Sequence, residues 1–459
     1  MRFEKKMISQ WVTHRCERQL GLSLWTDAEQ ASPAGHALGI PHRQIRPGFH
    51  QMARAGDEWQ AEKTADLIAA FGPDSVLGHP SPTIKRDPSG GYKAVSYEPV
   101  ELDRFLPGAV PGTFLVETEF DPLNPVFEAR WRLDWVHTLP LAFRRVRPDA
   151  IQVGHSRQFA SGITPAGELV DLTEDPRVPL RVIDMKLSSQ PGPGYFAEVT
   201  YYALALSAWL AHRRLDGQFA VAADAAVWPG SFDVSRVRAH GPSALDHDLE
   251  LVPIEVFVSE IARFFKEILP RVATTAATPA WSTDLSWHVV PSCAGCDYLG
   301  QTFPGVRSGS GAASQPHPNH CVPTAHDTDH LCRLPFLPRG GLTVLARTGI
   351  ARTAVLAERR ASDRCFDEHH SLRAGRSIIP ARARALAGGR IGIPGQDATT
   401  QCIPKWSDLS LYVTADFDPS SAITFAFGLS GFFFPNPFRA GGGQPEPACA
   451  GPRIHGPAA

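Results

Sequence analysis

The sequence has no long uninterrupted run of apolar residues. Its longest apolar tract, residues 196–211, contains Glu198 and is shorter than the roughly 20 residues that a membrane-spanning helix needs. Near the amino terminus, residues 8–15 lack the continuous apolar core of a signal peptide. We therefore expect a soluble, cytoplasmic protein with no membrane partner.

An excess of charge of one sign is also missing. The formal net charge of the 459 residues is −2, which excludes a strongly basic protein that coats nucleic acid with its whole surface. Any contact with nucleic acid must then come from local clusters of Arg and Lys. Hydrophobic residues make up 43% of the chain, enough for cores of ordinary size, and the length favours two or three folded units.

Cysteine is scarce, with eight residues spread from Cys16 to Cys449. This spacing is unlike the dense disulfide framework of a small secreted domain. In a reducing compartment, metal binding is the expected use of any cysteine cluster. After Phe438 the sequence is rich in Gly, Pro and Ala, which predicts a disordered tail over residues 439–459.

Hydrophobic periodicity predicts an α/β protein. Several segments have apolar residues at helical spacing, and short runs of branched and aromatic residues predict strands between residues 75 and 185. Residues 29–48, rich in Pro, Gly and His, predict a loop. Strands followed by a covering helix indicate a mixed central sheet flanked by helices. The predicted helices are 56–71, 195–213 and 254–271, and the predicted strands include 113–116, 150–153 and 180–183.

One predicted strand brings an acid and a lysine to the same face. In Ile183-Asp184-Met185-Lys186 the two charged residues are two apart, and side chains alternate along a strand. An earlier strand supplies a second carboxylate, Asp149. Two such carboxylates can hold a hard divalent cation, which can activate water against a phosphodiester. Taken alone, Asp184 and Lys186 also fit an ordinary ion pair at the end of a strand.

The order of three short motifs resembles the PD-(D/E)XK nuclease superfamily, in particular its RecB-like branch, which includes the CRISPR-associated exonucleases. The motifs are Arg147-Pro148-Asp149, Ile183-Asp184-Met185-Lys186 and Glu198-Val199-Thr200-Tyr201-Tyr202. Where this chain has Glu198, the branch usually has Gln. The resemblance covers residues 8–345, and the predicted nuclease domain spans residues 1–345.

This resemblance implies a PD-(D/E)XK core and a metal-dependent nuclease. It implies that Asp149 and Asp184 bind Mg²⁺ or Mn²⁺, while Lys186 positions or activates the attacking water and offsets charge on the scissile phosphate. Glu198 and Tyr202 complete the implied catalytic set. The implied substrate is DNA at single-stranded ends, and the implied partners include a helicase or another repair or recombination protein.

A further acid for the metal is expected from the helix that precedes the strands. The candidates are Glu58 and Glu62, and we take Glu58 as the third metal ligand. The family's pattern of Gly, an aromatic residue and Glu falls on Gly56, Trp59 and Gln60, so Gln60 occupies the usual acid position. Both glutamates also fit an ordinary solvated helix face.

Four cysteines resemble the ligands of the family's four-iron four-sulfur cluster. They are Cys16 before the nuclease core, and Cys293, Cys296 and Cys321 after it. Cys332 competes with Cys321 as the fourth ligand, although its apolar neighbours also fit a buried thiol. Zinc is the rival metal, because zinc sites take mixed Cys and His ligands. The nearby histidines are His317, His320, His326 and His330.

The carboxyl-terminal part predicts further units. Residues 346–405 predict a helical connector, in which Gly349-Ile350 resembles a helix-hairpin-helix element. Residues 406–438 resemble the start of an RNase H-like exonuclease domain, because a predicted strand ends in Asp416 and Asp418. Few residues follow this acid pair, so such a domain would be truncated. The same acids also fit an ordinary turn before a proline.

Two other interpretations of the whole chain stay open. The nuclease fold could persist without holding metal, as a non-catalytic nucleic-acid-binding or scaffold module, and Gln60 and Glu198 favour this alternative. The truncated acid pair and the Gly- and Pro-rich tail would also fit a damaged reading frame.

Overall fold

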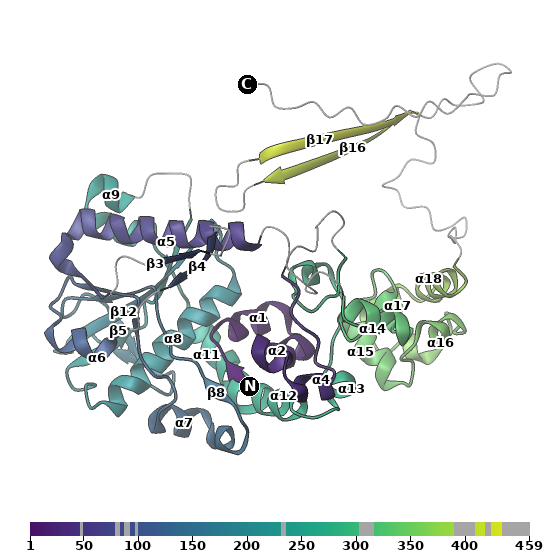
Figure 1. Cartoon of the computed structure of the whole chain (residues 1–459), viewed down its shortest axis with the longest axis horizontal. Helices are drawn as coiled ribbons and strands as arrows, with labels where there is room; N and C mark the ends of the chain where they lie inside the picture. Colours follow the sequence, from purple (N-terminus) through teal and green to yellow (C-terminus); the bar gives the residue numbers. More distant parts are fainter. Residues whose placement is uncertain are drawn as a thin grey trace.

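The computed structural model consists of a larger lobe built around a sheet and a smaller helical lobe (Figure 1). In the part of the chain that it describes, every helix is too short or too polar to cross a lipid bilayer. The described residues are 1–45, 49–78, 83–86, 92–96, 100–230, 236–302, 316–389, 409–417 and 424–433.

A mixed sheet of nine strands forms the centre of the larger lobe. Seven strands lie in the order β11-β10-β13-β12-β9-β6-β2, and β14 pairs with both β12 and β15. β12 is parallel to β13 and β14 and antiparallel to β9, so the predicted mixed sheet is confirmed. The strands are β2 (Val76–Gly78), β6 (Phe114–Val116), β9 (Ala150–Val153), β10 (Ser161–Ile163), β11 (Leu169–Asp171), β12 (Val178–Lys186), β13 (Phe219–Ala222), β14 (Ala226–Pro229) and β15 (Glu250–Leu251).

Three two-stranded pairs accompany the central sheet. They are β1 (Arg2–Phe3) with β8 (Ala142–Phe143), β3 (Thr83–Arg86) with β4 (Tyr92–Ser96), and β5 (Val100–Glu101) with β7 (Thr118–Glu119). The helices of this lobe are α1 (Lys6–His14), α2 (Glu17–Ser23), α3 (Asp27–Gln30), α4 (Pro33–Ala37), α5 (Phe49–Phe71), α6 (Leu102–Phe105), α7 (Pro125–Trp131), α8 (Pro193–His212), α9 (Arg236–His240), α10 (Leu245–Asp248), α11 (Ile254–Arg263), α12 (Leu269–Ala276) and α13 (Trp281–Asp284).

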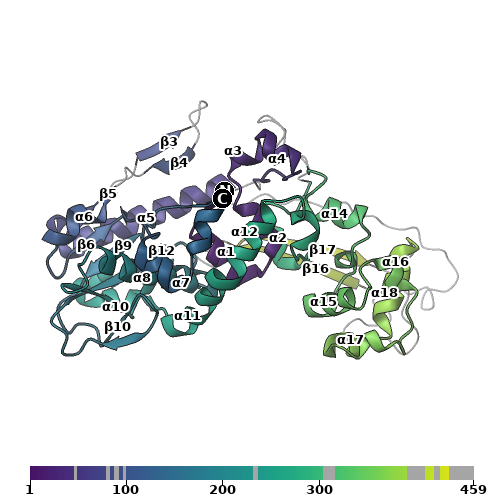
Figure 2. The same ribbon diagram turned by 90° about the horizontal axis from the view of Figure 1, so that it is seen from below.

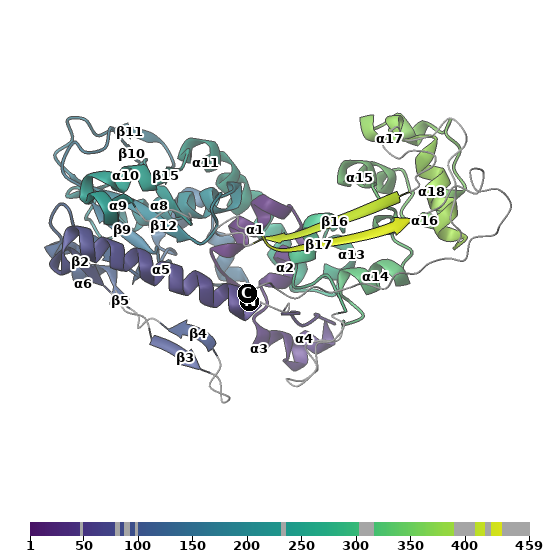
Figure 3. The ribbon, with the colours of Figure 1, turned by 90° about the horizontal axis from the view of Figure 1, so that it is seen from above.

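Helices α5 and α8 cover opposite faces of the sheet, and alternation along β12 explains both contacts. Leu180 and Val182 belong to the hydrophobic cluster that contains α8, whereas Ile183 and Met185 belong to the cluster that contains the end of α5. Nearly all of α8 is buried, as its apolar sequence requires. Figures 1 and 3 show α5 running along one side of the sheet.

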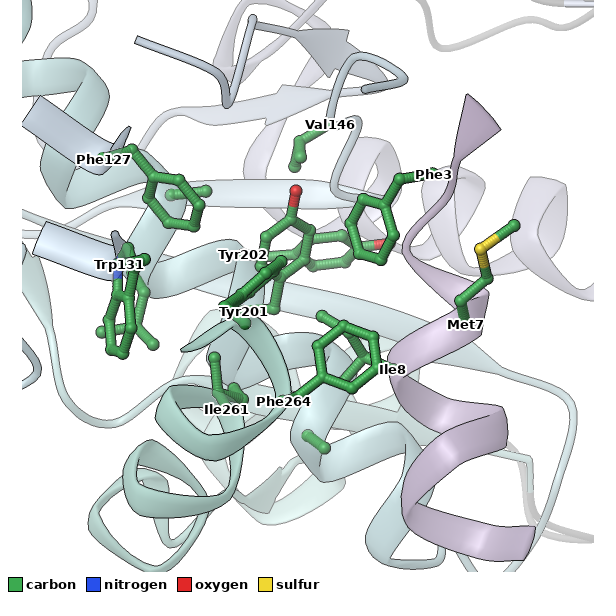
Figure 4. Packing of buried hydrophobic residues seen from close by; sticks show 14 of the residues in the cluster. Phe3, Met7, Ile8, Phe127, Trp131, Val146, Tyr201, Tyr202, Ile261 and Phe264 are labelled. Carbon is green, nitrogen blue, oxygen red and sulfur yellow. The ribbon is translucent and has the colours of Figure 1, made fainter. Parts of the chain in front are cut away.

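The amino-terminal segment is part of the main hydrophobic core. β1 pairs in parallel with β8, and α1 packs along α8. Figure 4 shows Phe3 and Met7 beside Tyr201, Tyr202 and Phe264. The ring of Phe3 lies 6.0 Å from the rings of both Tyr201 and Phe264. Since such aromatic pairs add about 0.5–1.5 kcal/mol beyond their buried area, these contacts fix α1 against the sheet lobe.

A glycine sets the distance between α1 and α8. A Cβ atom at Gly194 would lie 2.7 Å from both Ser9 Oγ and Thr13 Oγ1, closer than ordinary contacts allow. The missing side chain therefore lets the two helices approach. Lys5, the residue immediately before α1, pairs with Glu198 of α8.

The predicted helices of the larger lobe are confirmed, although their bounds differ. α5 begins at Phe49 rather than at residue 56, because residues 49–55 also include good helix formers. The predicted helix 195–213 is α8. The predicted helix 254–271 is α11 and α12, joined by the π-helical turn Phe264–Ile268.

The predicted loop over residues 29–48 is wrong in part, because α3 ends and α4 lies within it. The hydroxyl of Thr26 accepts a hydrogen bond from the backbone N–H of Glu29, whose carboxylate accepts one from the backbone of Thr26. The hydroxyl of Ser32 caps α4 by accepting a hydrogen bond from the backbone N–H of Gly35, and Pro33 occupies the first helical position. These helix-start signals outweigh the high Pro and Gly content.

The smaller lobe has its own hydrophobic core, which runs from Leu331 to Ala383. This core includes Leu345 and Ile350, so it continues across the predicted boundary at residues 345 and 346. Figures 1 and 2 show α1 and α2 between this lobe and the sheet. Its helices are α14 (Cys321–Asp327), α15 (Arg339–Arg347), α16 (Thr353–Ala357), α17 (His370–Ala374) and α18 (Ile378–Ala387).

Strands β16 (Leu409–Phe417) and β17 (Thr424–Phe433) form a two-stranded antiparallel sheet. Among the described residues this hairpin pairs with no other strand. The strand predicted to end at the acid pair is thus confirmed as β16, which contains Asp416. Asp418 and the predicted tail at 439–459 lie outside the described residues.

Candidate active site

Three carboxylates lie side by side at the ends of neighbouring strands. The antiparallel register aligns the ends of β12, β9 and β6. The next residue beyond the last pair of each strand is an acid: Asp184 for β12, Asp149 for β9 and Glu117 for β6. The backbone N–H of Glu117 donates to the carbonyl of Asp149 at 3.1 Å, and the backbone N–H of Met185 donates to Asp149 Oδ2 at 2.5 Å. The sheet therefore brings the predicted pair together and adds Glu117 to it.

Lys186 lies between two of the acids. Its Nζ is 2.6 Å from Asp184 Oδ2 and 3.8 Å from Glu198 Oε1. Glu198 also accepts a hydrogen bond from the hydroxyl of Tyr202 at 3.0 Å and pairs with Lys5 Nζ at 3.2 Å. The predicted residues of β12 and α8 are therefore contiguous, and the amino-terminal segment adds a second lysine.

Burial changes the protonation of this cluster. It raises the pKa of Asp184, whose side chain is 0% exposed, to about 7, although the ammonium of Lys186 acts in the opposite direction. Burial also raises the pKa of Glu198, but the charges of Lys186 and Lys5 outweigh this effect and leave that pKa below its usual value. Burial lowers the pKa of Lys186, yet the neighbouring carboxylates raise it above its usual range. Lys186 is therefore a permanent cation.

One carboxylate oxygen of the cluster has no partner. Asp184 Oδ1 is buried and has no hydrogen-bond partner among the described residues. Leaving such an atom unsatisfied costs about 1–3 kcal/mol. Unpaired buried polar atoms are rare in native proteins and are often explained by a bound water or ion. This oxygen therefore has an unused capacity to accept a hydrogen bond or a cation contact.

Glu117 is the acid that the sequence motifs missed. Its backbone has a left-handed φ of 54°, which is uncommon for a residue other than glycine. Oε2 pairs with Arg147 Nε at 2.6 Å, and Oε1 accepts a hydrogen bond from the side-chain amide of Gln60. Burial, reinforced by the charge of Asp149, raises the pKa of Glu117 to about 8. The only signal in the sequence is an acid directly after an apolar strand.

The cluster borders a cavity of about 570 Å³, here called the acidic cavity. Helix α5 supplies one wall, and the ends of the central strands supply another. The lining residues are Lys5, Met52, Gly56, Asp57, Gln60, Glu117, Arg147, Asp149, Met185, Lys186, Leu187, Ser188 and Tyr195. Asp184 and Glu198 are buried and reach this cavity through their contacts with Lys186.

The predicted helix acids lie elsewhere. Glu58 is 60% exposed, pairs with Arg54 on the same helix and is not among the residues that line the acidic cavity. Glu62 is also exposed and lies 3.7 Å from Arg238. Instead, α5 contributes Gln60, which binds Glu117, and Asp57, which lines the acidic cavity. The structure therefore places Glu117, and not Glu58, beside the two aspartates. Gln60 faces the acidic cavity, and Glu58, two positions before it on α5, lies on another face of the helix.

The four predicted cysteine ligands meet in a second place. Cys16, Cys293, Cys296 and Cys321 all line one small cavity of about 20 Å³ between the start of α2, the segment after α13 and the start of α14. Cys332 is not among the lining residues. Burial raises the pKa of Cys16, and that of Cys321 to about 12, so without a metal these groups are neutral thiols.

Two of the histidines predicted as rival zinc ligands, His320 and His330, are engaged elsewhere. Both ring nitrogens of His320 bind backbone groups, Nε2 at the carbonyl of His42 and Nδ1 at the N–H of His317. The Nδ1 atom of His330 accepts from the N–H of Cys332, and its ring stacks on Trp287. These contacts disfavour His320 and His330 as ligands, whereas His14 and His288 line the cysteine cavity.

Neither cluster forms a ready metal site in the part of the chain that the structure describes. Within the described ranges, no three His, Cys, Asp or Glu side chains stand at metal-ligand spacing. In the acidic cluster the reason is visible, since Lys186 and Arg147 occupy carboxylate oxygens of Asp184 and Glu117. A cation would have to displace these contacts.

Comparison with known proteins gives no further guide. No protein-family model, no curated protein and no solved structure matches this chain. The assignment of a function therefore depends on the geometry of the site.

Proposed function

We propose that this chain is a metal-dependent DNA nuclease of the RecB-like PD-(D/E)XK type that hydrolyses phosphodiesters at single-stranded ends. One observation carries the proposal: Asp149, Asp184 and Glu117 lie on adjacent strand ends, with Lys186 beside them at a cavity large enough for a nucleotide. A purely structural pair of Asp184 and Lys186 would not need the buried acids Asp149 and Glu117 at the same strand ends. Each of them costs desolvation energy without adding to the pair.

The acids fit a hard divalent cation. Their oxygens are the ligands that Mg²⁺ and Mn²⁺ prefer, and Asp184 Oδ1 is buried without a partner among the described residues. Asp149, Asp184 and Glu117 would hold the cation. It would supply Lewis-acid polarisation of the phosphodiester and lower the pKa of a bound water.

Lys186 would act on the substrate rather than on the fold. Its permanent positive charge at the cavity wall offsets negative charge that develops on the scissile phosphate. Glu198 and Asp184 hold the ammonium from two sides, and Tyr202 fixes Glu198 by its hydroxyl. Glu198 and Tyr202 are thus positioning residues.

We also propose that Cys16, Cys293, Cys296 and Cys321 bind a four-iron four-sulfur cluster, with zinc as the alternative. The support is that all four line one cavity although they come from distant parts of the sequence. Thiolate ligation there would join α2 to the segments that lead into the smaller lobe. The carboxyl-terminal resemblance to an RNase H-like domain and a helicase or repair partner remain proposals with less support.

A second candidate is a non-catalytic nucleic-acid-binding or scaffold module. The observation in its favour is that Gln60 takes the usual acid position and that Lys186 and Arg147 occupy the carboxylates. Titration calorimetry with Mn²⁺ separates the two candidates. The nuclease binds Mn²⁺ with a heat that Asp149→Asn removes, whereas the module gives no heat that depends on Asp149.

The direct test is digestion of end-labelled single- and double-stranded DNA with Mg²⁺, with Mn²⁺ or with chelator. We expect shortening of single strands only when a metal is present. The matched control is Glu58→Gln, which removes an exposed carboxylate of the same helix and should leave cleavage unchanged. Equal products with chelator would exclude the proposed chemistry.

A further inference from the structure

A second cavity adjoins the acidic cavity and is lined mainly by basic side chains, whereas equal numbers of acidic and basic side chains line the acidic cavity. Its volume is about 450 Å³. Lys5 and Arg147 line both cavities, so the two are neighbours. We call it the basic cavity, and its lining residues are Glu4, Lys5, Lys6, Glu119, Arg144, Arg145, Val146 and Arg147. Five of these side chains are basic and two are acidic, in a chain whose net charge is slightly negative.

The local fold explains why the positive charges gather there. The run Arg144-Arg145-Val146-Arg147 follows β8 and leads directly to Asp149. Because β1 pairs in parallel with β8, the residues after β1 follow the same course and place Lys5 and Lys6 beside this run. One segment of chain therefore carries basic side chains from the basic cavity to the acid cluster.

The existing ion pairs leave these cations accessible. Arg144 is 61% exposed and pairs with Glu4 at 3.3 Å, while Arg145 pairs with Glu101 and Glu119 and is 38% exposed. Glu4 and Glu119 are only 19% and 14% exposed, whereas Glu101 is 51% exposed. The Arg145–Glu101 pair is therefore an exposed ion pair, which contributes little to stability, so a phosphate can replace Glu101 at small cost. Guanidinium groups bind phosphate oxygens through two parallel hydrogen bonds.

We propose that the basic cavity binds a phosphate of the nucleic-acid strand next to the one that is cleaved. This inference rests on the proposed nuclease function, and it assigns Arg144 and Arg145 to substrate binding outside the acid cluster. Lys5 and Arg147 stand where the strand would pass between the two cavities. The phosphate is either a bridging phosphodiester or a terminal monoester, because both present the same anionic oxygens.

The test measures binding by the full chain with chelator present, using internally labelled single-stranded oligonucleotides. The variant Arg144→Gln/Arg145→Gln is compared with Arg130→Gln/Arg347→Gln, which removes two exposed arginines that line neither cavity. We expect about ten-fold weaker binding by the first variant at low salt and a slope of log affinity against log salt that is smaller by about 1.4. The control should bind like the wild type.

The oligonucleotides identify the source of the phosphate. If a terminal monoester is bound, a terminal phosphate tightens wild-type binding and has no effect on the Arg144→Gln/Arg145→Gln variant. If a bridging diester is bound, uncharged methylphosphonate linkages near the end weaken wild-type binding but not that variant. Polyglutamate is a competitor that carries carboxylates instead of phosphates. If polyglutamate displaces DNA at equal charge concentration, the proposal is overturned.

A parallel cleavage assay keeps the two proposals apart. Suppose that the wild type cleaves DNA, and that the Arg144→Gln/Arg145→Gln variant binds the oligonucleotides with the same affinities as the wild type. This result would overturn the phosphate subsite alone. Wild type that never cleaves would remove the proposed nuclease activity, whatever the variant binds. With both proposals right, the variant raises KM about ten-fold and leaves kcat unchanged, because the acid cluster is intact.

Discussion

At the scale of single residues, the site combines buried acids with cations that are held close to them. Burial alone would favour neutral carboxyl groups, and the pKa values of Asp184 and Glu117 are raised accordingly, to about 7 and about 8. Lys186 and Arg147 oppose this effect. The balance makes protonation of the metal-free site sensitive to pH near neutrality.

Stability of the metal-free protein should therefore fall as pH rises from about 5 to about 8. Between their usual and their raised pKa values, Glu117 and Asp184 bind more protons in the folded than in the unfolded state, so raising the pH favours unfolding. Glu117→Gln should flatten this dependence and stabilise the protein near pH 8 by at least about 1 kcal/mol. Urea unfolding with chelator present measures both, and Glu58→Gln is the control. An unchanged pH slope in Glu117→Gln would show that Glu117 is ionised throughout.

The cysteine cavity gives a second residue-scale prediction. Protein purified without oxygen should be brown and contain iron and sulfide, and Cys16→Ser should lose both because one of the four thiol ligands is removed. Cys332→Ser is the matched control, since Cys332 does not line the cavity. Metal analysis with visible absorbance checks the result. A colourless wild-type protein with stoichiometric zinc would decide for zinc.

At the scale of elements, α1 approaches α8 closely at Gly194. Gly194→Ala adds a methyl group that would meet Ser9 and Thr13, so we expect a loss of stability of about 1–3 kcal/mol. Gly217→Ala is the control, because an added Cβ there has no neighbour within 4 Å. Thermal unfolding compares the two. Equal stability of both variants would mean that α1 moves away without cost.

Element identity was easier to predict than the site. The apolar run before Asp184 and the apolar length of α8 determine a central strand and a buried helix, and both are confirmed. α3 and α4 depend on capping at Thr26 and Ser32, which a composition-based prediction overlooks. Glu117 could not be assigned from its neighbours, because only the pairing of β6 with β9 brings it to Asp149.

At the scale of the whole molecule, the catalytic proposal involves the larger lobe alone. The described hydrophobic clusters end at Ala383, and the β16–β17 hairpin pairs with no other described strand. A chain of residues 1–389 should therefore unfold at the same temperature within about 2 °C and cleave DNA as the full chain does. Calorimetry and the cleavage assay check this. Loss of cleavage with unchanged unfolding would assign the carboxyl-terminal segment a part in the activity.

The most direct test of the account is metal-dependent cleavage by Asp184→Asn. This variant keeps the size of the buried side chain and removes its charge, so the fold should persist while a metal ligand and the partner of Lys186 are lost. We predict that Mg²⁺ or Mn²⁺ supports digestion of end-labelled single-stranded DNA by the wild type, and that Asp184→Asn is at least about 100-fold slower with unchanged circular dichroism. Full activity of a folded Asp184→Asn protein would contradict the account.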